Sequence, residues 1–160
     1  MSYVSRKNIP ENTIEARSYQ TAIADSALSA NTLVVLPTGM GKTAVALLVA
    51  ADRIDTGKVL MLAPTKPLVE QHLRYFSKNL LLEEGDVVMF TGSTPSPKRV
   101  AAWNAARFVI ATPEVIKNDL TAGRYGLEEV SLLIVDECHR TVGNYAYVFK
   151  VQQVDGMKMD

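Results

Sequence analysis

Short apolar runs alternate along the chain with longer segments whose apolar positions recur at helical spacing. The apolar runs are four or five residues long and are bounded by turn residues, which is typical of strands buried on both faces. Continuous apolar strands of this kind are characteristic of parallel sheets. The predicted strands are Leu33–Leu36, Lys58–Leu62, Val87–Phe90, Phe108–Ala111 and Leu132–Val135.

Segments with helical periodicity separate these strands. We predict helices over about 18–28, 43–53, 66–79, 97–106 and 113–122. Ser96 is the expected cap of the fourth helix, and Pro97 its first residue. The helix that begins near Thr43 is apolar nearly all round, which predicts burial on more than one side. Strands alternating with helices imply right-handed crossovers, so the strand-to-helix turns share the carboxyl edge of the sheet, where ligands bind.

The turn after the first strand reads Leu36-Pro37-Thr38-Gly39-Met40-Gly41-Lys42-Thr43. Gly39 and Gly41 allow a tight turn with inward-facing N–H groups, and the following helix N-terminus also favours an anion. In a phosphate-binding loop, Lys42 would approach the β- and γ-phosphates and the Thr43 hydroxyl would bind Mg²⁺. Leu36 stands where the general pattern has its first glycine. The alternative, a glycine turn with a solvent-facing lysine, does not explain so apolar a strand before it.

The fifth predicted strand ends in two acids, Asp136 and Glu137. We expect Asp136 to hold Mg²⁺ through water and Glu137 to orient or deprotonate an attacking water. Acids after a strand also serve as simple turn or cap residues. Their pairing with Lys42 and Thr43 favours a catalytic site in which Lys42, Asp136 and Glu137 act together. Cys138 is expected to be a packing residue.

Threonines follow three predicted strands, at Thr65, Thr91 and Thr112. Each turn can offer hydroxyls and N–H groups to a phosphate without basic charge, or the threonines can simply cap the next helices. Three on one edge favour a track for a nucleic-acid backbone, read without base contacts. The residues predicted to form this track are Thr65, Lys66, Thr91, Gly92, Thr112 and Pro113.

The first predicted helix opens with residues suited to an adenine base. Gln20 carries a donor and an acceptor, and Arg17 could stack on a flat ring. An ordinary surface helix start explains them equally well. The full set predicted to bind nucleotide is Arg17, Gln20, Thr38, Gly39, Met40, Gly41, Lys42 and Thr43.

Composition limits the number of domains, the use of disulfides or zinc, and the expected location. The chain has 160 residues, 48% of them hydrophobic, which suits one compact domain. Lys and Arg total 17 and so do Asp and Glu, which excludes a polybasic tail but not binding through dipoles and a few cations. One cysteine and two histidines make a disulfide framework or structural zinc site improbable. With no signal peptide and no apolar run long enough to span a bilayer, we expect a reducing, cytoplasmic location, at the nucleoid or in the nucleus.

Together these segments resemble the first motor domain of superfamily-2 helicases, from about Ile14 to Phe149. The glycine turn resembles motif I and Asp136-Glu137-Cys138-His139 resembles motif II. The segments 63–68, 91–92 and 111–114 resemble motifs Ia, Ic and Ib, which grip the strand backbone. The resemblance implies a three-layer P-loop RecA-like α/β domain that binds ATP and Mg²⁺.

Within that superfamily, segments 31–39, 63–69 and 139–147 look most similar to the archaeal Hef and Fanconi-anaemia M helicases. This similarity implies an ATP-dependent DNA helicase or translocase that acts on forked or branched DNA in repair. The double-stranded RNA sensor and Dicer branch has similar motifs, so an RNA translocase is the alternative. A nucleotide-gated clamp that binds DNA without stepping is another.

The family's motif III and its second motor domain have no counterpart in this sequence. We therefore expect residues 1–13 to be a lead-in and residues 14–160 a partial RecA-like domain, with no unwinding by this chain alone. In the family, the motif III strand lies between the strands of motifs I and II. A sheet without that strand must close the gap, pair with another chain or a second copy, or expose apolar surface.

Overall fold

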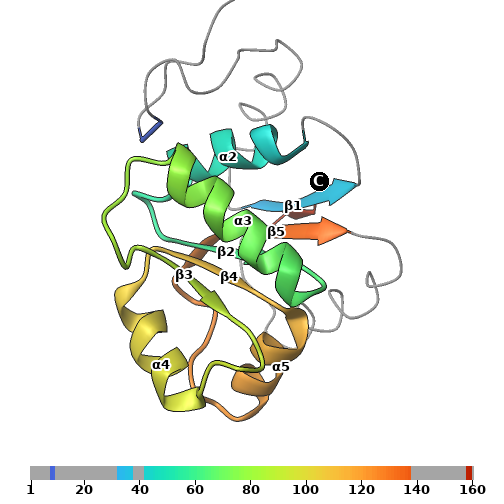
Figure 1. Cartoon of the computed structure of the whole chain (residues 1–160), viewed down its shortest axis with the longest axis vertical. Coiled ribbons are helices and arrows are strands. Elements are labelled where there is room, and N and C mark those ends of the chain that lie inside the picture. Colours follow the sequence, from blue (N-terminus) through green and yellow to red (C-terminus); the bar gives the residue numbers. More distant parts are fainter. Residues whose placement is uncertain (1–7, 10–31, 38–41, 138–157, 160) are drawn as a thin grey trace, which may run out of the picture.

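The computed structural model describes residues 8–9, 32–37, 42–137 and 158–159, with side chains at 8–9 and 43–136. Its elements, drawn in Figure 1, are β1 (Thr32–Pro37), α2 (Lys42–Arg53), β2 (Lys58–Leu62), α3 (Lys66–Asn79), β3 (Val87–Phe90), α4 (Ser96–Ala105), β4 (Phe108–Ala111), α5 (Pro113–Thr121), β5 (Val130–Glu137) and β6 (Lys158–Met159). None of the described helices is long and apolar enough to cross a membrane.

The strands form one sheet in the order β3-β4-β2-β5-β1-β6, and every neighbouring pair is parallel. Helices α2 and α3 cover one face and α4 and α5 the other (Figure 1). Successive strand residues serve opposite faces. Val59 and Met61 join the core under α2 and α3, whereas Leu60 and Leu62 join the core under α4 and α5. The predicted three-layer α/β fold is therefore confirmed.

The predicted bounds hold for β2, α3, β3 and β4, and β1 and β5 are longer than predicted. Helix α2 begins one residue earlier than predicted, and α4 and α5 each end one residue earlier. The helix predicted over 18–28 lies outside the described residues. Three further details differ. Ser96 is the first residue of α4 rather than its cap, because Pro95 occupies the cap position with extended backbone. Asn8 and Ile9 fall in the predicted lead-in, yet Ile9 is 4% exposed in the core and Asn8 donates to the Ala51 carbonyl. Strand β6 was not predicted.

Strands β1 and β5 lie directly side by side, with six residue pairs from Thr32–Leu132 to Pro37–Glu137. If the chain lacks the family's motif III strand, as the sequence predicts, this direct pairing closes the gap within the chain, the first of the three expected outcomes. Strand β6 pairs with the other edge of β1 at Thr32 and Leu33. Among the described residues, no strand stands between β1 and β5.

A buried ionic network joins α4, α5 and the loop that follows. The Asp119 side chain is fully buried, and Arg99, Arg124 and Tyr125 all donate to it over 2.7–2.8 Å. Burial alone would raise the pKa of Asp119, but hydrogen bonds from Arg99, Tyr125 and Arg124 outweigh it and hold the pKa below its ordinary value. Trp103 stacks on Tyr125 with ring centroids 4.1 Å apart, which closes the network on its apolar side.

Asp119→Asn should lower the free energy of unfolding by about 3 kcal/mol, because it leaves the buried Arg99 charge without its counter-ion. Urea unfolding followed by circular dichroism measures the change. Glu84→Gln, at an exposed acid, is the matched control and should shift stability by no more than about 0.5 kcal/mol. Equal effects of the two substitutions on unfolding free energy would contradict the role of Asp119 as the buried counter-ion of Arg99.

The same network predicts an acid dependence of stability. Since the folded pKa of Asp119 lies below its ordinary value of 3.8, its contribution is complete above that value and is lost as the pH falls through the lower, folded one. The difference in unfolding free energy between wild type and Asp119→Asn should stay constant near neutral pH and shrink in acid. A difference that does not change down to about pH 2 would refute it.

Candidate functional site

The carboxyl ends of β1 and β5 bring two distant segments of the sequence together. In their register, Leu36 lies opposite Asp136, and Pro37 lies opposite Glu137. The predicted glycine turn leaves β1 at Pro37, so it begins beside the strand that carries the two acids. Two segments about a hundred residues apart therefore share one edge of the sheet, as the sequence predicted.

Helix α2 fixes the far side of this turn. Residues 45–51 are all buried, between 0% and 3% exposed, which confirms the predicted burial on several sides. Close packing on several sides restricts rotation and sliding of this helix, and its first residue is Lys42. Thr43 in its first turn is half-buried. The N–H groups at such a helix start are suited to bind an anion.

The side-chain oxygens of Thr43 and Asp136 are donors of the kind that Mg²⁺ binds. Among the described residues, no group of three or more His, Cys, Asp or Glu side chains could hold a metal ion. Mg²⁺ prefers oxygen ligands and usually takes one or two from protein, the rest coming from water and substrate phosphates. The Thr43 hydroxyl and the Asp136 carboxylate fit that description.

Asp136 has a partner that the sequence analysis missed. The Nε2 atom of His72, on α3, lies 2.7 Å from Oδ2 of Asp136, and both side chains are largely buried. A signal for it exists in the sequence. His72 falls on the same helical stripe as Val69 and Phe76, where an apolar residue is expected, and a polar group in a buried stripe needs a partner.

Two of the predicted nucleic-acid turns touch each other. Lys66, at the start of α3, donates from Nζ to the Ser93 hydroxyl over 3.3 Å. Thr91 is 2% exposed, and its hydroxyl lies 2.9 Å from that of Ser93. The Thr91 side chain therefore shapes the turn from within, while the neighbouring Gly92 is exposed. The turns after β2 and β3 thus form one continuous surface at the carboxyl edge.

The other two threonines stand at helix caps without using their hydroxyls there. Thr65 and Thr112 occupy the cap positions of α3 and α5, and neither side chain bonds to its helix. Thr65 is exposed and Thr112 half-buried, whereas Pro113 is buried as the first residue of α5. Both threonines therefore occupy cap positions, as the simpler explanation predicted, but neither hydroxyl makes the capping hydrogen bond.

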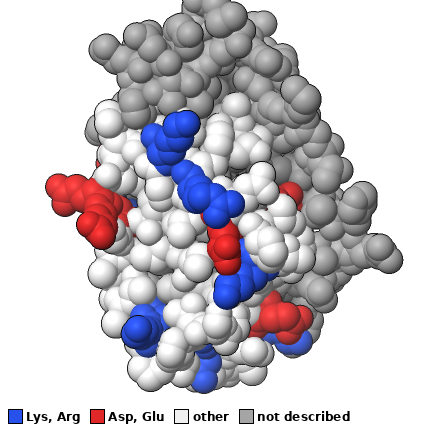
Figure 2. Space-filling view, in the orientation of Figure 1, with Lys and Arg blue, Asp and Glu red and all other residues white. Residues whose placement is uncertain are grey.

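Charge on the described surface is mixed. Figure 2 shows the face that carries α3, where basic and acidic side chains are interspersed over a largely uncharged surface. Lys66, Glu70, Arg74 and Lys78 recur every four residues along that helix. Glu70 forms opposite-charge i,i+4 pairs with Lys66 and Arg74, which favour the helix, whereas Arg74 and Lys78 carry the same charge. This row does not make a strongly basic patch.

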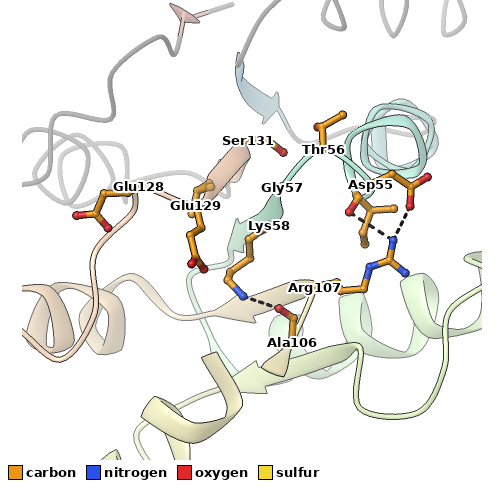
Figure 3. Close-up of a pocket in the computed structure, with 11 residues that line it drawn as sticks. Asp55, Thr56, Gly57, Lys58, Ala106, Arg107, Glu128, Glu129 and Ser131 are labelled. Atoms are coloured by element: carbon orange, nitrogen blue, oxygen red, sulfur yellow. Dashed lines mark hydrogen bonds and ion pairs between the residues drawn. The ribbon is translucent and has the colours of Figure 1, made fainter. Parts of the chain in front are cut away.

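A cavity of about 520 Å³ lies at the opposite, amino edge of the sheet (Figure 3). Its wall is formed by the segments that precede or begin β2, β4 and β5, residues 54–58, 106–107 and 128–131. Within it, Arg107 pairs with Asp55, and Lys58 donates to the Ala106 carbonyl at the end of α4. These polar groups serve to close the ends of α2 and α4, away from the edge that carries Asp136.

Several predicted site residues lie outside the described part of the chain. They are Arg17, Gln20, Thr38, Gly39, Met40 and Gly41. Cys138, the predicted packing residue, also lies outside the described part. Lys42 and Glu137 are placed by their backbone alone, at the start of α2 and the end of β5. Their predicted roles remain predictions.

A parallel sheet with helices on both faces, in which the strand that leads into a glycine-rich segment lies beside the strand that ends in two acids, is typical of RecA-like α/β domains. The chain belongs to the DEAD/DEAH box helicase family, which matches residues 17–156.

Similar proteins agree with that membership. A protein of Methanocaldococcus jannaschii whose name describes an ATP-dependent RNA helicase is 45% identical over 149 residues, 92% of this chain and 19% of that protein. The DEAD-box ATP-dependent DNA helicase Fancm of Drosophila melanogaster is 41% identical over 143 residues, 85% of this chain and 10% of its own length. The Pyrococcus furiosus Hef helicase domain superposes with a TM-score of 0.82 at 44% identity, over 95% of this chain and 34% of that structure.

Lys42→Ala should weaken binding of a fluorescent ADP by about 10- to 100-fold, because a charged hydrogen bond to phosphate is worth about 1.5–3 kcal/mol. Fluorescence titration in the presence of Mg²⁺ measures the affinity. Lys78→Ala, an exposed lysine in the last turn of α3, is the control and should bind normally. Unchanged affinity in the Lys42 variant would rule out the phosphate loop.

Proposed function

We propose that this chain is the ATP-binding motor domain of a DNA helicase or translocase that acts on forked or branched DNA in repair. The observation that carries the proposal is the register of β1 on β5, which aligns the start of the glycine turn with Asp136 and Glu137. Membership of the DEAD/DEAH box helicase family supports an ATP-driven motor. The likeness to the Hef helicase domain and to Fancm supports the DNA-repair branch.

Each residue of the nucleotide site has a distinct task in this proposal. Gly39, Gly41 and Lys42 bind the phosphates, and Thr38 and Met40 complete the turn. Bound Mg²⁺, held by Thr43 and by Asp136 through water, would neutralise charge on the phosphates. Glu137 orients the attacking water on the side opposite the leaving phosphate.

The adenine end of the site belongs to a different segment. Arg17 and Gln20 are proposed to stack on the base and to hydrogen-bond its edge. Together with the phosphate and magnesium ligands they give the domain a preference for ATP.

The nucleic-acid backbone is proposed to cross the surface formed by the turns after β2, β3 and β4. Thr65 and Lys66 supply a hydroxyl and a cation, and Gly92 an exposed N–H at a turn shaped by Thr91. The residues of the third turn are Thr112 and Pro113. Mixed charge on the neighbouring α3 fits binding through dipoles and hydrogen bonds, independent of base sequence.

Movement along a strand needs a second motor domain. The chain spans 19% of the length of the Methanocaldococcus relative and 10% of that of Fancm. We propose that a second RecA-like domain closes on this one when ATP binds and opens after hydrolysis. This chain alone would bind nucleotide without unwinding DNA, and it could self-associate.

A double-stranded RNA translocase is the second candidate, favoured by the name of the Methanocaldococcus relative, which describes an RNA helicase. A nucleotide-gated clamp would share the same site but not step.

ATP hydrolysis by a full-length protein that carries this domain tests whether the substrate is DNA or RNA. Forked DNA should stimulate it more than double-stranded RNA at equal concentration. The reverse order would select the RNA candidate. A strand-displacement assay separates the clamp, which requires ATP binding but shows no directional movement.

Gly92→Ala should weaken binding of single-stranded DNA while leaving the fold intact. A Cβ built at Gly92 meets no atom within 4 Å, so the substitution costs the domain no clash, but it places a methyl group beside the proposed phosphate contact. We expect a roughly threefold to tenfold loss, of the order of one hydrogen bond. Fluorescence anisotropy with a labelled oligonucleotide measures it.

The control is Ser77→Ala, at an exposed position near the other end of α3, which should bind as wild type does. Thermal melts should show both variants folded. Normal DNA affinity in Gly92→Ala would remove the turn after β3 from the proposed track.

A further inference from the structure

The buried face of α3 carries two polar side chains among apolar ones. The inward residues are Val69, His72, Phe76 and Asn79. Asn79 finds its hydrogen-bond partner within the same helix, since its side-chain amide donates to the Tyr75 carbonyl. His72 instead reaches another element and meets Asp136 at the carboxyl end of β5.

The contact is short, enclosed and directional. Nε2 of His72 lies 2.7 Å from Oδ2 of Asp136, and the two side chains are 9% and 14% exposed. An ionised carboxylate can only accept, so Nε2 carries the proton and donates it. The ring of Phe76, with its centroid 6.3 Å from that of His72, packs beside the imidazole on the same helix face. The imidazole is thus held by packing while its hydrogen bond fixes the carboxylate.

We propose that His72 is a positioning residue for the magnesium ligand Asp136. Rotation about the Cβ–Cγ bond of Asp136 decides where its oxygens point. Through the hydrogen bond to Oδ2, His72 selects one rotation and so presets the carboxylate toward the metal water. This inference rests on the proposed nucleotide site and adds a residue from α3, whose first turn forms part of the proposed nucleic-acid track.

A positioning role makes a prediction that general stability does not. Loss of the hydrogen bond should weaken binding of Mg²⁺ and leave the phosphate contacts of the turn intact. Partners that orient a metal ligand change metal affinity by about 10- to 100-fold when removed. His72→Phe and His72→Ala should therefore raise the Mg²⁺ concentration for half-maximal binding of fluorescent ADP by about tenfold, with little change in metal-free ADP affinity.

The conservative and control variants separate geometry from packing. His72→Gln keeps an N–H donor at similar reach and should restore most of the Mg²⁺ dependence. Asn79→Leu replaces the other polar residue of the same stripe, which lies two turns from His72 and whose side-chain amide donates to the Tyr75 carbonyl. It should leave the Mg²⁺ requirement unchanged. Thermal melts establish which variants fold, and either His72→Phe or His72→Ala suffices for the comparison.

The outcomes are distinguishable. A wild-type chain that fails to bind ADP with Mg²⁺ overturns the proposed nucleotide site and this inference with it. Normal wild-type binding with an unshifted Mg²⁺ requirement in folded His72→Phe or His72→Ala overturns this inference alone. Equal losses of affinity with and without Mg²⁺ assign His72 to packing and also overturn it. A shifted requirement that His72→Gln restores supports the positioning role.

Discussion

The pairing of β1 with β5 is the constraint on which the site depends. Six consecutive residue pairs fix the register, so a slip of one residue would move Asp136 away from Leu36 and turn it to the opposite face. Parallel strands also end at the same edge, which is why a turn near residue 40 and acids near residue 136 can meet. Backbone pairing alone therefore decides which residues of the two segments are neighbours at this edge.

Packing then makes the edge rigid. Helix α2 is buried along most of its length, and β2 and β5 carry apolar residues to both cores. On the other face, the Asp119 network ties α4 to α5, and Arg99 within it also donates to the Thr94 carbonyl in the turn after β3. The turns at the carboxyl edge are therefore supported from both layers. Loops that bind ligands need such support, because their own backbone is satisfied only in part.

The sequence predicted those parts of the fold that depend on local pattern. Strands β2, β3 and β4 and helix α3 begin and end at the predicted residues. The apolar runs of β2 and β4 are fully buried and that of the edge strand β3 partly buried, and the helix has one buried face. The cap of α4 was misplaced by one residue, since two prolines flank Ser96 and either could start a helix. Strand β6 is only two residues long and has no pattern to detect. The burial of Ile9 depends on a distant helix, which periodicity cannot reveal.

The candidate site was predictable to the extent that its chemistry lies in short motifs. Asp136 at a strand end and Thr43 at a helix start could be placed on one edge from topology alone. The His72 contact could not, because it joins α3 to β5 across 64 residues and depends on the rotation of one helix. Nor could the internal role of Thr91, whose hydroxyl is used by its own turn. Long-range side-chain pairing is fixed by packing, and local sequence carries little information about it.

A crystal structure with Mg²⁺ and ADP tests the account most directly. It predicts the β-phosphate at the turn between β1 and α2, with Mg²⁺ about 2.1 Å from the Thr43 hydroxyl and one water away from the Asp136 carboxylate. Nucleotide bound at the amino-edge cavity, or a metal ion distant from both Thr43 and Asp136, would contradict it.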